Sequence, residues 1–209
     1  MQISDPDVRL MLAFRKGDDS ALSDLYRRWA GPLLRYLERM VHDHATAEEL
    51  LQEAFIRVHD ARSRYSPKAR FSTWLFRIAR NLALNELDRA HRRMPHITTD
   101  AAEASDDTRR PSLTLVSKSP SALSQVETRR TSSRLEAELA RLPERQRSAL
   151  WLAVVEGYAY DEVAEILDTS NASVKSLVHR ARSALADRMS DRKAESARDA
   201  NDETSEMRR

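Results

Sequence analysis

The chain contains no cysteine and only three glycines among its 209 residues. The missing thiol groups exclude disulfides, thiolate nucleophiles and zinc sites with cysteine ligands, and they favour a reducing cytoplasm as the compartment. Glycine is scarce and long runs of β-branched residues are few, which argues against sheet-rich folds. We therefore predict an all-α protein.

Long apolar segments are also missing. The first ten residues, MQISDPDVRL, contain no apolar stretch of the kind found in signal peptides. The longest apolar run, residues 149–155, is much shorter than the roughly 20 residues that span a bilayer. We expect neither export nor membrane insertion.

The motifs of common enzymes are absent as well. No glycine-rich phosphate loop and no nucleophile motif occurs. His42 and His44 are close in sequence, but no convincing third metal ligand lies near them. An enzyme is therefore the least favoured class, and we expect no catalytic residue, no metal and no cofactor.

Charges of opposite sign are concentrated in adjacent segments, although the net charge is only +2. Between residues 38 and 55 there are five acidic residues and one arginine, whereas between residues 57 and 93 there are ten basic residues and three acidic ones. We expect an acidic patch and a basic patch on the surface.

Helical periodicity continues through residues 7–93, the first predicted domain. Because proline is disfavoured inside helices, Gly31-Pro32 divides one long pattern into helices of about 19–30 and 32–42. Thr46 and Glu49 form a capping box that would start the next helix. The last helix is predicted at about 71–92.

Composition changes sharply after this domain. Residues 94–133 are rich in Ser, Thr, Asp and Pro without sustained periodicity, which predicts a flexible linker. A second helical domain is predicted at residues 134–189, including a helix from Glu144 to Glu156. The charged tail, residues 190–209, has almost no apolar residue, and we expect it to be disordered.

The second domain contains a predicted helix-turn-helix at residues 161–187. The first helix would end at Leu167, residues 168–170 would form the turn, and the second helix would begin at Asn171. On this plan the second helix enters the major groove of DNA, and its N-terminal half reads base edges. A helical hairpin inside a bundle is the alternative.

One face of the second helix is polar. Ser170 and Asn171 suit the N-cap, where free backbone N–H groups can also bind a phosphate. The candidates for contacts with phosphates and base edges are Ser170, Asn171, Ser173, Lys175, Ser176, His179, Arg180 and Arg182. A solvated face would show the same charges.

The first domain has a basic stripe with an aromatic residue. Arg70, Trp74, Arg77 and Asn81 share one side of the predicted helix at 71–92. Cations that follow phosphates and rings that stack on unpaired bases are typical of single-strand binding. A core position is the alternative for Trp74.

Two stretches match a known family. The stretch AEELLQEAFIRVHDARSRYSPKARFSTWLFRIARNLALNELDRAHRR resembles region 2 of bacterial sigma factors of the extracytoplasmic-function (ECF) branch of the sigma-70 family. The stretch LPERQRSALWLAVVEGYAYDEVAEILDTSNASVKSLVHRARSAL resembles region 4 of the same branch. The resemblance implies a helical bundle at 7–93 and a helix-turn-helix domain at 134–189.

The resemblance also implies partners. Members of the branch bind core RNA polymerase, read the −35 promoter element as duplex DNA with region 4, and melt and capture the −10 element with region 2. Glu49, Gln52 and Glu53 fall on positions that contact the clamp helices of the β′ subunit; solvation would also explain them. Ala61 and Tyr65 fall in the loop that holds a flipped −10 base, and Asn81 on a −10 contact position. Region 4 also touches the β flap, and an anti-sigma factor is a family expectation.

Two positions depart from the family pattern. Asp168 replaces the frequent turn glycine, and aspartate tolerates the left-handed conformation better than most residues. Leu177 replaces a frequent arginine, which puts the −35 sequence preference in doubt. The alternative function is a helix-turn-helix regulator that binds promoters without polymerase, but this would leave the aromatic and basic stripe unexplained.

Overall fold

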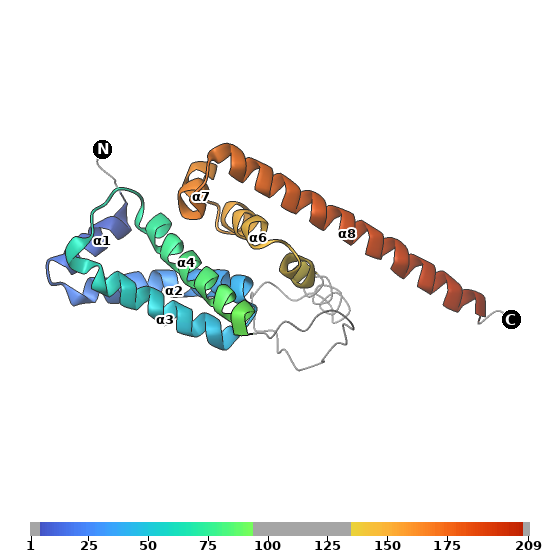
Figure 1. Cartoon of the computed structure of the whole chain (residues 1–209), viewed down its shortest axis with the longest axis horizontal. Helices are drawn as coiled ribbons and strands as arrows, with labels where there is room; N and C mark the ends of the chain where they lie inside the picture. Colours follow the sequence, from blue (N-terminus) through green and yellow to red (C-terminus); the bar gives the residue numbers. More distant parts are fainter. Residues whose placement is uncertain (1–4, 94–134, 207–209) are drawn as a thin grey trace, which may run out of the picture.

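The computed structural model describes residues 5–93 and 135–206, with side chains through residue 190. The predicted linker, residues 94–133, lies outside this range. The described residues are helical and include no strand, which confirms the all-α prediction. They form two groups of helices, one from each predicted domain (Figure 1).

The first group is a four-helix bundle. Its helices are α1 (Pro6–Arg15), α2 (Asp19–Val41), α3 (His44–Asp60) and α4 (Phe71–Arg93), with a short 3-10 helix η1 (Arg62–Arg64) before α4. α2 packs on α1 and α3, and α4 packs across α2 and α3. The centre of the bundle is fully buried and contains Met11, Phe14, Leu25, Leu33, Phe71 and Leu75.

α2 corrects the predicted break at Pro32, because the helix is continuous from Asp19 to Val41. A proline inside a helix removes one backbone hydrogen bond and costs about 3 kcal/mol. Leu25 before it and Leu33 and Leu37 after it all lie in the same core. A straight helix keeps both halves buried, and this packing outweighs the local penalty.

The start of α3 differs from the predicted capping box. The helix begins at His44, and Asp43 is its N-cap. The Asp43 carboxylate accepts a hydrogen bond of 2.7 Å from the Thr46 backbone N–H. A hydrogen bond with the Thr46 side chain, together with this backbone bond, lowers the pKa of Asp43 below its usual value. A carboxylate is a stronger acceptor than the threonine hydroxyl and lies nearer to the start of the helix.

The second group consists of α6 (Glu144–Leu150), η2 (Trp151–Val155), α7 (Tyr160–Leu167) and α8 (Asn171–Glu206), preceded by helical residues 135–140. The predicted helix from Glu144 to Glu156 is present, but its last turn is the π-helix η2. The Glu156 N–H donates to the Trp151 carbonyl at 3.1 Å, which closes this wider turn.

α8 continues to Glu206, where the sequence predicted a disordered tail from residue 190. After Gly157 the sequence contains no further glycine and no proline. The usual residues that end a helix are therefore missing, and alanine, arginine and glutamate favour helix continuation. None of the helices within 5–93 and 135–206 has the length and apolar content to cross a membrane.

Candidate nucleic-acid interface

α7 and α8 form the predicted helix-turn-helix. Val163, Ile166 and Leu167 of α7 are buried, and Val174 and Val178 of α8 are buried with them. The turn between the helices begins at Asp168, which has the left-handed φ of 51°. The Thr169 N–H donates to the Ala164 carbonyl at 2.9 Å and completes the turn. Aspartate thus occupies the conformation for which the family often uses glycine.

The N-terminal turn of α8 is capped as predicted. The Ser170 hydroxyl accepts a hydrogen bond of 3.2 Å from the Ser173 backbone N–H. The polar side chains that follow are exposed, apart from the half-buried Ser173; the exposed ones are Asn171, Lys175, Ser176, His179, Arg180 and Arg182. Arg180 donates from Nε to the Ser176 carbonyl at 3.3 Å. These exposed residues form a polar face of α8 that carries positive charge and hydrogen-bond donors.

Leu177 belongs to the buried side of α8 and not to this polar face. Its exposed fraction is 8%, and it lies between the buried residues Val174 and Val178 in the sequence. The resemblance to the family predicted that Leu177 replaces an arginine that often contacts DNA. Its position three residues after Val174 is the helical spacing that could have assigned it to the core.

α4 carries the predicted aromatic and basic stripe. Arg70, Arg77 and Asn81 are exposed, while Trp74 is half-buried. The Trp74 ring lies 5.0 Å from the Tyr65 ring and 5.8 Å from the Phe71 ring, measured between ring centroids. Trp74 therefore packs on the bundle and leaves part of its ring at the surface. Both interpretations of Trp74 from the sequence, a core residue and a surface for stacking, are therefore compatible with its position.

Tyr65 is a buried residue, with an exposed fraction of 5%. Its hydroxyl is buried without a hydrogen-bond partner among the described residues. Burial raises the pKa of Tyr65 to about 12. Ala61, at the end of α3, is half-buried. In this conformation the Tyr65 ring is part of the packed interior and not the wall of an open base pocket.

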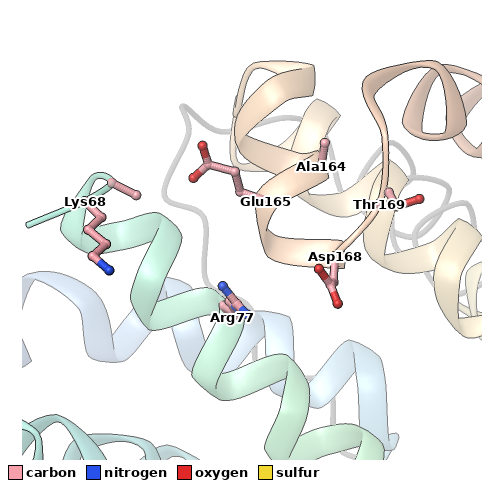
Figure 2. Close-up of a pocket in the computed structure, with 7 residues that line it drawn as sticks. Lys68, Arg77, Ala164, Glu165, Asp168 and Thr169 are labelled. Atoms are coloured by element: carbon pink, nitrogen blue, oxygen red, sulfur yellow. The ribbon is translucent and has the colours of Figure 1, made fainter.

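A cleft between α4 and α7 was not predicted from the sequence. Its volume is about 460 Å³, and it is lined by Lys68, Ala69 and Arg77 on one side and by Ala164, Glu165, Asp168 and Thr169 on the other. Figure 2 shows Lys68 and Arg77 on one side of this cleft and Glu165 and Asp168 on the other. Cations of the first helical group thus face acids of the second across the cleft.

The acidic face of α3 is formed as predicted. Glu49 and Gln52 are exposed, and Glu53 is half-buried, with an ion pair of 2.9 Å to Arg57. Ile56 lies on the same face and is 54% exposed. Sequence analysis missed this apolar residue, although its spacing of three and four residues from Glu53 and Gln52 indicates a shared face.

His42 is the C-cap of α2, and His44 is the first residue of α3. His44 contacts the carboxylates of Glu38 and Glu48 through its two ring nitrogens. The hydrogen bond that the His44 ring donates to the Glu38 carboxylate raises the pKa of His44 above its usual value. No group of three or more metal-ligating residues occurs within 5–93 or 135–190.

Comparisons with known proteins agree with this architecture. The family model of sigma-70 region 2 matches residues 25–93, and that of sigma-70 region 4 matches residues 132–185. The chain is 30% identical over 185 residues to the RNA polymerase sigma-H factor of Pseudomonas aeruginosa, covering 88% of this chain and 94% of the relative. It is 32% identical over 179 residues to the ECF RNA polymerase sigma-E factor of Escherichia coli K12, covering 86% of this chain and 92% of the relative.

Two solved structures share the fold. CnrH, solved in complex with the cytosolic domain of CnrY, has a TM-score of 0.64 at 21% identity and covers 88% of this chain and 97% of its own. The sigma factor RpoE from Bartonella quintana, solved with the anti-sigma factor NepR, has a TM-score of 0.56 at 21% identity and covers 78% of this chain and 94% of its own. The sequence match and the fold match both extend over the two helical groups.

Proposed function

This chain belongs to the extracytoplasmic-function branch of the sigma-70 family of sigma factors, and we propose that it directs core RNA polymerase to promoters by reading two elements. In this proposal α8 reads the −35 element as duplex DNA, and α4 captures the melted −10 element. The observation that supports it most is that α4 and α8 each carry exposed cationic and hydrogen-bonding side chains on one side.

The −35 function is supported by the position of the polar side chains on α8. Asn171, Lys175 and Ser176 lie in its first two turns and are exposed. These turns of a recognition helix approach base edges. Arg180 and Arg182 lie one turn later and are suited to phosphates. A Ser170 cap with free N–H groups near it adds a further phosphate-binding feature.

The −10 function is supported by α4. Arg70 and Arg77 supply positive charge, and Asn81 supplies an amide for hydrogen bonds. The exposed part of the Trp74 ring offers a surface on which an unpaired base can stack, a contact that contributes about 1–3 kcal/mol. A role for Tyr65 or Ala61 in holding a flipped base requires the loop after α3 to open, because the Tyr65 ring is buried in the free chain.

The polymerase function is assigned to α3. Glu49, Gln52 and Glu53 present carboxylates and an amide, and Ile56 extends the same face with exposed apolar surface. An apolar centre with a polar rim is the usual composition of a protein interface. We propose that this face binds the clamp helices of the β′ subunit. Contact of region 4 with the β flap stays a prediction without assigned residues, as does an anti-sigma partner.

Reconstituted transcription tests the proposal. Core polymerase is incubated with the chain and a library of genomic fragments, and promoter-specific transcripts are sequenced. We expect defined start sites with the wild-type chain and at least about a tenfold loss with Gln52→Ala, because a central interface residue can contribute about 2 kcal/mol or more. Asp60→Ala, a change at an exposed acid at the end of the same helix, is the control.

The runner-up is a helix-turn-helix regulator that acts without polymerase, and it is supported by α7 and α8 alone. A gel shift with the isolated chain separates the two functions. Tight, specific duplex binding without core polymerase, together with no promoter-specific transcript in the reconstituted assay, would favour the regulator.

A further inference from the structure

The loop between α3 and α4, residues 61–70, is attached to the segment around α1. α1 packs against η1, which lies in this loop, and against α4. We propose that Asp5 and Arg15 are positioning residues for the −10 element, because they fix the backbone of the 61–70 loop and so set base selectivity without touching DNA. This inference rests on the proposed function for the role of the loop, but the attachment itself can be measured in the free chain.

Arg15, the last residue of α1, holds the middle of the 61–70 loop. Its Nη1 donates a hydrogen bond of 3.0 Å to the Tyr65 backbone carbonyl, 50 positions later in the sequence. The guanidinium is always charged, and a hydrogen bond from a charged donor is stronger than one between neutral groups. Because the acceptor is a backbone atom, this bond fixes the path of the chain at Tyr65 and leaves the side chain unrestrained.

Asp5 holds the end of the 61–70 loop, where α4 begins. It is the N-cap of α1, and its Oδ1 accepts a hydrogen bond of 2.9 Å from the Asp7 backbone N–H. Its Oδ2 accepts a hydrogen bond of 3.0 Å from the backbone N–H of Phe71, the first residue of α4. A negative charge is favourable at a helix N-terminus. One carboxylate therefore caps two helices and fixes where α4 starts relative to α1.

Arg62 attaches the start of the 61–70 loop. Its guanidinium lies over the Phe14 ring, 4.8 Å from the ring centroid, and pairs with Asp19 at 3.2 Å. Phe14 is fully buried, so its ring is a fixed surface for this contact. Each of the two contacts is weak by itself at a partly exposed site. Together with Arg15 and Asp5, however, Arg62 gives the loop attachments at its start, middle and end, all to the N-terminal part of the chain.

The Tyr65 side chain is held less firmly than the backbone of the loop. Its buried hydroxyl has no hydrogen-bond partner among the described residues. A buried hydroxyl without a partner destabilises the position that it occupies. The ring therefore loses no hydrogen bond when it turns outward. Because Arg15 binds the Tyr65 carbonyl and not the ring, the opening that a flipped base requires can be a rotation of this ring on a backbone that stays in place.

The attached loop lies next to the proposed stacking surface. The Tyr65 ring is 5.0 Å from the Trp74 ring of α4, measured between centroids. A group that discriminates between ligands must be held within about 0.5 Å of its working position by the residues that support it. The bonds from Arg15 and Asp5 to the loop backbone provide such support beside Trp74. Loss of either bond should therefore reduce the discrimination between bases more than the overall affinity for a single strand.

Hydrogen exchange in the free, full-length chain tests the attachment. Arg15→Met removes the donor to the Tyr65 carbonyl, and Asp5→Ala removes the acceptor of the Phe71 N–H. We expect the backbone amides of residues 61–74 to exchange about fivefold faster in each variant than in wild type, because the loss of one hydrogen bond makes local opening easier. Mass spectrometry of the peptides that cover these residues measures the rates.

Each variant has a matched control. Arg9→Met removes another exposed cation from α1 and should leave the exchange of the 61–70 loop unchanged. Asp18→Ala removes the N-cap of α2, whose carboxylate accepts from the Ser20 N–H, and so deletes a helix cap of the same kind. If the loop exchanges equally fast in the variants and in their controls, the attachment does not exist and the inference is overturned.

Binding by the complex with core polymerase tests the effect on base selectivity. The complex is titrated with labelled single-stranded oligonucleotides of a −10 element found in the transcription assay, in which each position in turn carries each base or an abasic site. We expect Arg15→Met to reduce the discrimination at one position about fivefold, the lower end of what one base contact contributes. The affinity for the oligonucleotide that is abasic at this position should not change. Arg15→Lys keeps a cationic donor and should restore part of the discrimination.

The ratio of affinities separates positioning from a merely structural role. Partial unfolding would weaken binding to all oligonucleotides alike and would leave their ratios unchanged. Faster exchange in Arg15→Met without a change in these ratios would show that the attachment does not set selectivity, and this would overturn the inference. If no chain directs transcription with core polymerase, the proposed function fails, while hydrogen exchange still shows whether α1 attaches the 61–70 loop.

Discussion

The Arg147 guanidinium of α6 donates a hydrogen bond to the Met40 backbone carbonyl, 3.2 Å away and near the end of α2. The same guanidinium donates to the carbonyls of Ala140 at 2.9 Å and Leu142 at 3.2 Å. Carbonyls near a helix end lack partners within the helix, and a cation there is favourable. One buried side chain therefore supports the ends of two helices that belong to different helical groups.

Replacing Arg147 should destabilise the protein. In Arg147→Met three carbonyls lose their donor, and we expect the free energy of unfolding to fall by about 3 kcal/mol. Urea unfolding followed by circular dichroism measures this change. Arg145→Met, at an exposed position of the same helix, should change stability by less than about 0.5 kcal/mol. Equal effects of the two substitutions would show that the three bonds contribute nothing specific.

Leu177 offers a second prediction, because the family often has arginine at this position. Leu177 is 8% exposed, so Leu177→Arg would force a cation against the core of the helix-turn-helix. We expect a loss of about 2–4 kcal/mol of stability and no gain of −35 affinity. Leu177→Met keeps the volume and should cost less than about 1.5 kcal/mol. Tighter promoter binding by a stable Leu177→Arg chain would contradict the assignment of Leu177 to the core.

The polar face of α8 predicts two different effects on duplex binding. Lys175 lies in the first two turns, so Lys175→Ala should weaken binding to the −35 element by about 1–3 kcal/mol and relax its sequence preference. Arg180→Ala should weaken binding to all sequences alike and reduce the salt dependence by about one charge. Titrations of specific and scrambled duplexes at several salt concentrations measure both quantities.

Arg145→Ala serves as the control for these titrations, since it removes one exposed cation outside the face. Unchanged affinity at moderate salt for either α8 variant would remove that residue from the site.

His44 predicts a local pH dependence. Its pKa is raised above 6.5, chiefly by the hydrogen bond that its ring donates to the Glu38 carboxylate and also by the charges of Glu48 and Asp43. A raised pKa in the folded state means that the stabilisation is fully present below pH about 6.5 and is lost as the pH rises through the folded-state pKa. An NMR titration should give a lower pKa for His44 in Glu38→Gln than in wild type. Equal pKa values in the two chains would refute the contact with Glu38.

Helical periodicity was sufficient to predict local structure where one buried face dominates. The helix expected at about 71–92 is Phe71–Arg93, and the helix expected to begin at Asn171 does so, with Val174, Val178 and Ala181 buried at helical spacing. The exposure of the polar residues on α4 and α8 followed from the same spacing, because side chains opposite a buried stripe are exposed. Asp168 was also correctly expected to tolerate the turn, where its φ is 51°.

Predictions from local sequence were incomplete or wrong where contacts between residues far apart in the sequence determine the structure. Pro32 remains helical because both halves of α2 are buried in one core. Trp74 is neither wholly core nor wholly surface, since its ring packs on Tyr65, which precedes it in a loop. The hydrogen bond of 3.0 Å between the Tyr36 hydroxyl of α2 and the Ser148 hydroxyl of α6 could not be predicted, because periodicity contains no information about residues 112 positions apart.

The Arg39 guanidinium lies over the Trp151 ring, 5.4 Å from its centroid. Of the three tryptophans in the sequence, Trp151 alone belongs to the second helical group, and a cation from α2 of the first group lies over its ring. Separation of the groups would expose the indole to water and shift its fluorescence to longer wavelengths. The protein thus contains an intrinsic optical probe, so that any separation of the two helical groups can be followed in stopped-flow mixing without an attached dye.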